Sequence, residues 1–112
     1  MSSELLQRTK VFAVNVVVFI RKIKISFTNK NILDQLLRSS TSVGANYQEA
    51  SGSGTNNDFK HKINICRKES QETRYWIEVL SEFVNEEQKM ELRILWKESD
   101  ELSKIFGKIS KA

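Results

Sequence analysis

Apolar residues in the first 27 positions recur at steps of three, four or seven, which predicts a long amphipathic helix. We expect this helix to run from about Glu4 to Ser26. A second apolar stripe lies beside the first, so the helix should be buried on two sides, by bundle partners or by another subunit. The first stripe consists of Leu5, Phe12, Val16, Phe19, Ile23 and Phe27, and the second of Val11, Val14 and Val18.

The same helical spacing predicts three more helices. The second should span about Asn31 to Ala50, with Ile32, Leu36, Val43, Tyr47 and Ala50 facing inward and Leu33 and Leu37 beside them. The third should carry an unbroken apolar seam made of Phe59, Ile63, Cys66, Ser70, Thr73, Ile77 and Leu80. The fourth should continue to the end of the chain through Leu92, Leu95, Ser99, Leu102, Phe106 and Ile109.

Polar residues at the expected boundaries support these helices. Thr28-Asn29 offers oxygens that could cap the second helix, while Thr55 with Asp58 and Asn85 with Gln88 have the spacing of capping boxes. The chain has no proline, which suits uninterrupted helices. Short turns between long helices make sequential neighbours antiparallel. We therefore predict an all-α, up-down-up-down four-helix bundle with one domain over residues 1–112.

Composition narrows the classes of function. Cys66 is the only cysteine and His61 the only histidine, so an internal disulfide is impossible and a zinc site is disfavoured. We expect no metal and no cofactor, and the lack of a disulfide fits a cytoplasmic protein. The apolar run over 11–20 is too short to span a membrane, so it reads as a buried helix and no membrane partner is expected. A net charge of +4 permits a nucleic-acid partner without requiring one.

Polar residues of the second and third helices form one candidate site. These residues are Arg38, Asn46, Glu49, Glu69 and Glu72. Paired carboxylates can serve acid–base chemistry or bind two iron ions, but di-iron bundles use Glu-x-x-His motifs that this chain lacks. We favour a buried or subunit-facing structural network, because a polar network inside a bundle must have all its members satisfied. We accordingly predict no enzyme activity, no catalytic residue and no small-molecule substrate.

Basic residues of the third helix form a second candidate site. A stripe at helical spacing holds Lys60, Asn64, Arg67, Gln71 and Arg74, and it is flanked by Lys62 and Lys68. Such a ridge could contact successive phosphates of a nucleic acid. Glu78 and Glu82 continue the same face with the opposite charge, so an ordinary solvated helix surface is the other reading. On the same helix, Cys66 is expected in the core and His61 on the surface.

Two motifs make the chain resemble a known family. The first is Ser42-Val-Gly-Ala-Asn-Tyr-Gln-Glu-Ala50, and the second comprises Asp58-Phe59, Lys68-Glu69 and Glu72-Thr-Arg-Tyr-Trp76. With these motifs the sequence resembles the bacterial four-helix bundle proteins, also called the 23S rRNA intervening-sequence protein family. Some members of that family resemble the accessory protein of diversity-generating retroelements.

The resemblance implies a bacterial, cytoplasmic, non-enzymatic bundle that assembles as a homo-oligomer, with a pentamer favoured. It also implies RNA, or an RNA-processing protein such as a reverse transcriptase, as the partner class. A pure protein–protein interaction module without nucleic-acid binding is the alternative. The second apolar stripe of the first helix also favours oligomerisation, because cyclic assembly would bury it.

Overall fold

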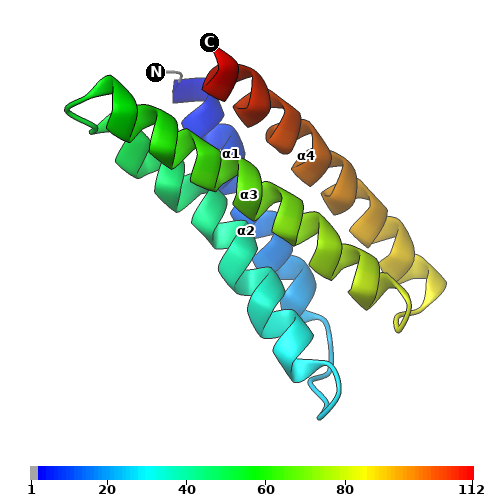
Figure 1. The fold of residues 1–112 in the computed structure, drawn as a ribbon. Coiled ribbons are helices and arrows are strands. Elements are labelled where there is room, and N and C mark those ends of the chain that lie inside the picture. The colour runs from blue at the N-terminus through cyan, green and yellow to red at the C-terminus, as the bar shows by residue number, and fades with distance from the viewer. Residues whose placement is uncertain (1–2) are drawn as a thin grey trace.

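The computed structural model describes residues 3–112, which form four α-helices and no strand. The helices are α1 (Ser3–Arg21), α2 (Lys30–Ser51), α3 (Asn56–Ser81) and α4 (Glu86–Lys111). They pack as an elongated all-α bundle of 45 × 22 × 20 Å in which consecutive helices run antiparallel (Figure 1). The predicted fold class is confirmed.

The inward faces of the helices are those that the apolar spacing predicts. The α3 seam is buried from Ile63 to Leu80, and only Phe59 at its start is half-buried. On α2, the neighbours Ile32 and Leu33 exchange their predicted places, because Leu33 is buried and Ile32 only partly so. The core thus runs the length of the bundle.

Hydroxyl groups let the helices approach one another closely inside this core. The Thr73 hydroxyl donates to the Ser39 hydroxyl at 2.9 Å, which links α3 to α2. The Ser99 hydroxyl donates to the Ser70 carbonyl at 2.7 Å, which links α4 to α3. Because these short side chains are satisfied by neighbours, the core tolerates them without unpaired polar groups.

Two helix starts confirm the sequence-based prediction of capping. Asn85 and Gln88 form both bonds of a capping box at the start of α4. At the start of α3, the Thr55 side chain accepts from the Asp58 amide at 3.1 Å, which is one of the two bonds of the predicted box. Each cap satisfies amide groups that the first turn of a helix leaves without a partner.

The end of the first helix was predicted wrongly. It ends at Arg21 instead of Ser26, and Phe27, which was expected in the core, is 99% exposed. The Asn29 side chain explains the difference, since it accepts from the Ser26 amide at 2.7 Å and donates to the Lys24 carbonyl at 3.0 Å. These bonds fold residues 22–29 into a turn, and they also keep the Asn29 side chain from capping α2 as predicted.

Candidate functional site

Arg38 brings together one part of the predicted polar network. Its guanidinium donates to Glu69 at 3.0 Å and to Glu72, joining α2 to α3. The Trp76 indole donates to the same Glu72 carboxylate at 3.0 Å. The cluster lies at the surface of the single chain, since the Arg38 side chain is 45% exposed. Of the two settings expected from the sequence, it is therefore not buried within the bundle, and a subunit-facing setting stays a prediction.

The other two members of that network lie apart from it. Asn46 donates its amide to the Ser42 carbonyl of its own helix at 2.8 Å, and Glu49 accepts from Lys62 at 2.8 Å. Both residues were expected beside Glu69 and Glu72 because of antiparallel packing of the two helices. The antiparallel register places them elsewhere, since Ser39 lies opposite Thr73, whereas Val43 lies opposite Cys66 and Glu49 opposite Lys62.

The electrostatics of the Arg38 cluster keep it ionised. Hydrogen bonds to Glu69 and then to Glu72 raise the pKa of Arg38 above its usual value. Partial burial raises the pKa of Glu72, but the hydrogen bonds from Trp76 and Arg38 outweigh it and hold this pKa below its usual value. A carboxylate that stays charged at neutral pH is a poor proton donor.

Cys66, the one thiol of the chain, is fully buried between α2 and α3. It donates to the Val43 carbonyl at 3.4 Å. Burial raises the pKa of this thiol to about 12. Since the thiolate is the nucleophilic form, Cys66 is part of the core, as the sequence predicted, and not a reactive group.

The predicted basic stripe of α3 is largely taken up by contacts within the molecule. Arg74 pairs with Asp100 of α4 and stacks over the Trp96 ring at 5.8 Å. Arg67 lies half-buried against α4, where a Cβ built on Gly107 would stand 3.7 Å from its Cδ.

The remaining basic residues of this set differ in exposure. Lys62 is held by Glu49, Lys60 is half-buried and Lys68 is exposed. The stripe is therefore a seam between α3 and α4 at its arginines and opens to solvent at Lys68.

The contact between the first and last helices was not foreseen from the sequence. Arg8 of α1 donates twice to the Glu98 carboxylate of α4, at 2.8 and 2.7 Å, and Lys22 pairs with Glu91 at 2.9 Å. The paired residues are 90 and 69 positions apart, so no local spacing signals them. These ion pairs close the bundle.

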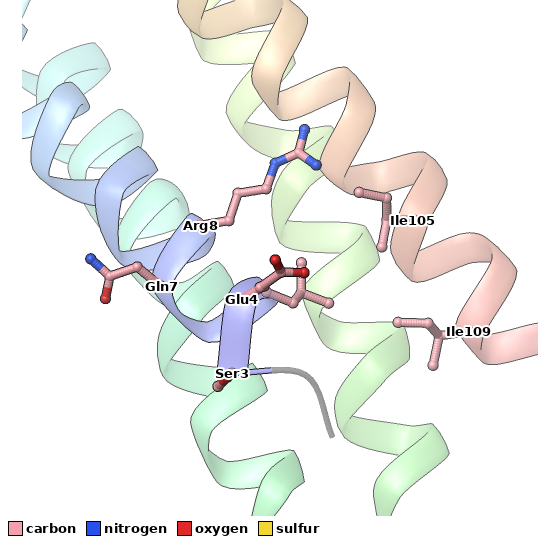
Figure 2. Close-up of a pocket in the computed structure, with 7 residues that line it drawn as sticks. Ser3, Glu4, Gln7, Arg8, Ile105 and Ile109 are labelled. Carbon is pink, nitrogen blue, oxygen red and sulfur yellow. The ribbon is translucent and has the colours of Figure 1, made fainter.

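An open groove of about 860 Å³ lies between the start of α1 and the end of α4. Figure 2 shows Arg8 reaching from α1 toward α4, while Ile105 and Ile109 project from α4 toward α1. Leu5, Ile105 and Ile109 give the groove an apolar lining, to which Glu4 and Arg8 add charged groups. It adjoins the outer face of α1, where the second apolar stripe lies.

The second stripe, which was expected to be buried by bundle partners or by another subunit, is not covered by the other helices of the chain. Val11, Val14 and Val18 are each between 46% and 50% exposed, on the side of α1 that faces away from the core. Val18 lines a shallow hollow together with Ile94 of α4, which is 70% exposed. The apolar surface therefore continues from α1 onto α4.

Two features are absent from residues 3–112. No group of three or more His, Cys, Asp or Glu side chains within residues 3–112 is arranged to hold a metal ion. Of α1 to α4, none combines the length and the apolar character that crossing a bilayer requires.

Comparison with known proteins places the chain in a family. Residues 1–108 match the family model described as the 23S rRNA-intervening sequence protein. A crystal structure from Bacteroides thetaiotaomicron, described as a protein with unknown function from the S23 ribosomal protein family, is 33% identical with a TM-score of 0.79. The alignment covers 96% of this chain and 98% of that one. No curated protein matches this sequence. The chain belongs to the 23S rRNA-intervening sequence protein family.

Proposed function

We propose that this protein is a non-catalytic scaffold that assembles with further copies of itself and holds RNA on the assembly. The observation that carries the proposal is the outer stripe of α1, where Val11, Val14 and Val18 lie half-exposed in a row. Contiguous exposed apolar patches on soluble proteins mark interaction sites. Polar residues at these positions would have served a free bundle better.

A second copy of the chain is the occupant that the surface fits. Val18 and the exposed Ile94 of α4 line one hollow, so the apolar surface of one copy can extend over both helices. A contact between this surface and a different face of the next copy would be a head-to-tail arrangement. Head-to-tail contacts close into rings when the rotation allows it. The resemblance described above favours five subunits.

The charged groups of the bundle support a role without catalysis. The Arg38 cluster consists of ion pairs, and the thiol of Cys66 is buried with a pKa raised to about 12. Acid–base and nucleophilic catalysis require groups with a pKa near the working pH or an activated nucleophile. The polar residues of this chain instead connect helices.

RNA is the proposed partner because the chain is basic and an assembly would repeat that charge. A subunit with a net charge of +4 gives a ring many weak phosphate contacts, which together strengthen binding. On α3, Lys68 is exposed and available for such contacts. An RNA-processing protein bound to the same ring is compatible with this role.

The first test is the mass of the protein in solution, measured by light scattering on a sizing column. We expect about 65 kDa, five times the chain mass of 13.0 kDa. Val14→Lys with Val18→Lys should shift the mass to that of one chain, since two charges would be buried in the contact. Leu37→Lys with Tyr75→Lys is the matched control, because both residues are exposed but lie on α2 and α3. A wild-type mass near 13.0 kDa would contradict the assembly.

The second test separates RNA from a protein partner by salt dependence. Binding through phosphates weakens as salt rises, with a log–log slope of about −0.7 for each contacted phosphate of a single strand. We expect RNA affinity to follow such a slope. Absent RNA binding at low salt, together with protein binding that persists at high salt, would favour the protein-interaction alternative.

A further inference from the structure

The loop between α1 and α2, residues 22–29, presents apolar side chains to solvent at one end of the bundle. Phe27 is 99% exposed and Ile25 is 66% exposed. An aromatic ring that contributes nothing to the core is available for contact with a ligand.

The loop holds Phe27 in a defined position. Besides the two bonds from its side chain, Asn29 donates its backbone amide to the Ser26 hydroxyl at 3.2 Å. The Lys30 amide donates to the Ser26 carbonyl at 3.1 Å. Four hydrogen bonds therefore brace the turn that carries Phe27, and binding there would need little further ordering of the backbone.

The charge of this region has one sign. Between Arg21 and Leu33 the sequence holds Arg21, Lys22, Lys24 and Lys30 and no acidic residue. Lys22 pairs with Glu91, whereas Arg21, Lys24 and Lys30 are exposed. The first turn of α2 also lacks an acidic residue, so its partial positive charge adds to that of the lysines. The α1–α2 connection itself is therefore basic and complementary to a polyanion, while exposed carboxylates begin at Asp34 of α2 and in the neighbouring α3–α4 connection.

A hollow lies beside the loop, and the polar side chains that line it already bond within the loop. It measures about 290 Å³, and its lining combines hydroxyl and amide groups with apolar side chains. The lining residues are Ser26, Thr28, Asn29, Ile32 and Phe83.

We propose that this loop is a binding site for single-stranded RNA, with a base stacked on Phe27 and the flanking phosphates held by Lys24 and Lys30. The inference rests on the proposed RNA-binding function and names its site. An aromatic ring among cations is the arrangement by which proteins bind single strands. Sequence-tolerant stacking on Phe27 would select unpaired over paired RNA, because paired bases are stacked on one another.

A single strand fits the end of the bundle better than an anionic membrane does. The neighbouring α3–α4 connection and the start of α4 expose Glu82, Glu86 and Glu87. A flat anionic surface that met Phe27 and Phe83 together would also meet these carboxylates, at an electrostatic cost. A single strand can follow the α1–α2 loop and avoid them.

The test uses the full chain and a fluorescently labelled oligouridylate, with affinity measured by anisotropy over a range of salt. Phe27→Ala should weaken binding by about tenfold, which is within the range for losing one stacked base. Because Phe27 is fully exposed, the variant should keep the wild-type fold, as circular dichroism can check. Tyr75→Ala is the matched control, since it removes an exposed aromatic ring from α3, and it should bind as the wild type does.

A second pair of variants tests the phosphate contacts. Lys24→Gln with Lys30→Gln should reduce the magnitude of the salt slope by about 1.4, the value for two phosphates of a single strand. Lys108→Gln with Lys111→Gln removes the same charge from the last turn of α4 and should leave the slope nearly unchanged.

The outcomes separate this inference from the proposed function. If the wild type binds the oligonucleotide and both loop variants bind equally well, the loop site is wrong while RNA binding stands. If the wild type binds no RNA, both proposals are wrong. Equal weakening of duplex RNA binding by Phe27→Ala would overturn the single-strand preference. Phe27-dependent sedimentation with phosphatidylserine vesicles, with RNA affinity unchanged in the variant, would assign the loop to a membrane.

Discussion

The Glu72 side chain accepts hydrogen bonds from two residues on different helices. Its carboxylate accepts from Arg38 of α2 and from the Trp76 indole one turn further along α3. Residue spacing made the meeting of Arg38 with α3 carboxylates predictable, because both helices were expected to be antiparallel neighbours. The separation of Asn46 and Glu49 from this cluster was missed, since it depends on the exact register of α2 against α3, which places Glu49 opposite Lys62.

We predict that the contribution of Glu72 to stability depends on pH. Its pKa is lower in the folded protein than the usual 4.5, so this contribution is present above 4.5 and is lost as pH falls through the folded value. Glu72→Gln should lower the free energy of unfolding by less than about 1 kcal/mol at pH 7, as for other partly exposed ion pairs.

Urea denaturation of the wild type and Glu72→Gln at pH 7 and at pH 3 measures this effect. The difference between the two proteins should shrink at the lower pH. Glu86→Gln is the control, because the Glu86 side chain is almost fully exposed and its ion pair with Lys89 is long, at 3.5 Å. A difference that grows on acidification would contradict the assigned pKa direction.

The helices were predictable as elements because their apolar periodicity is strong and their caps are local. Three of them, α2, α3 and α4, match the expected segments closely. The end of α1 was not predictable in this way. Ile23 and Phe27 continue the helical spacing, while the Asn29 side chain bonds back to Lys24 and Ser26. A hydrogen bond between a side chain and the backbone three to five residues away can end a helix without interrupting its apolar pattern.

The contact between α1 and α2 depends on Gly44. A Cβ built there would stand 3.0 Å from the Thr9 hydroxyl and 3.2 Å from its Cβ. Gly44→Val should therefore push the two helices apart and lower the free energy of unfolding by about 1–3 kcal/mol.

Thermal or urea denaturation measures this loss. Gly54→Val serves as the control, since nothing lies within 4 Å of a Cβ at Gly54. Equal stability of Gly44→Val and the wild type would show that the close approach of α1 to α2 is dispensable.

At the scale of the molecule, we predict that thermal stability depends on protein concentration. Folding coupled to assembly raises the melting temperature as concentration rises, whereas a bundle that is complete as one chain melts at a constant temperature. Calorimetry over a hundredfold range of concentration should show the rise for the wild type. Val14→Lys with Val18→Lys should abolish it, and a constant wild-type melting temperature would count against the assembly.

The up-down-up-down order was predictable from helix lengths and short turns, and the closure of the bundle was not. Arg8 of α1 pairs with Glu98 of α4, and Lys22, which follows the last residue of α1, pairs with Glu91 of α4. Such contacts depend on how the helices are rotated after packing, which apolar spacing specifies only coarsely. The exposed valines of α1 could be read from the sequence because they form a stripe of their own.

The groove between α1 and α4 has a consequence for the order of the chain. Ser3 of α1 and Ile109 of α4 line the same groove. The two ends of the ribbon lie together at one end of the bundle (Figure 1). A short peptide could connect them without disturbing a core residue. The protein is therefore suited to circular permutation, with new termini opened in the exposed Gly52–Gly54 turn. The resulting order, α3–α4–α1–α2, would turn the contacts between the first and last helices into contacts between neighbours in sequence.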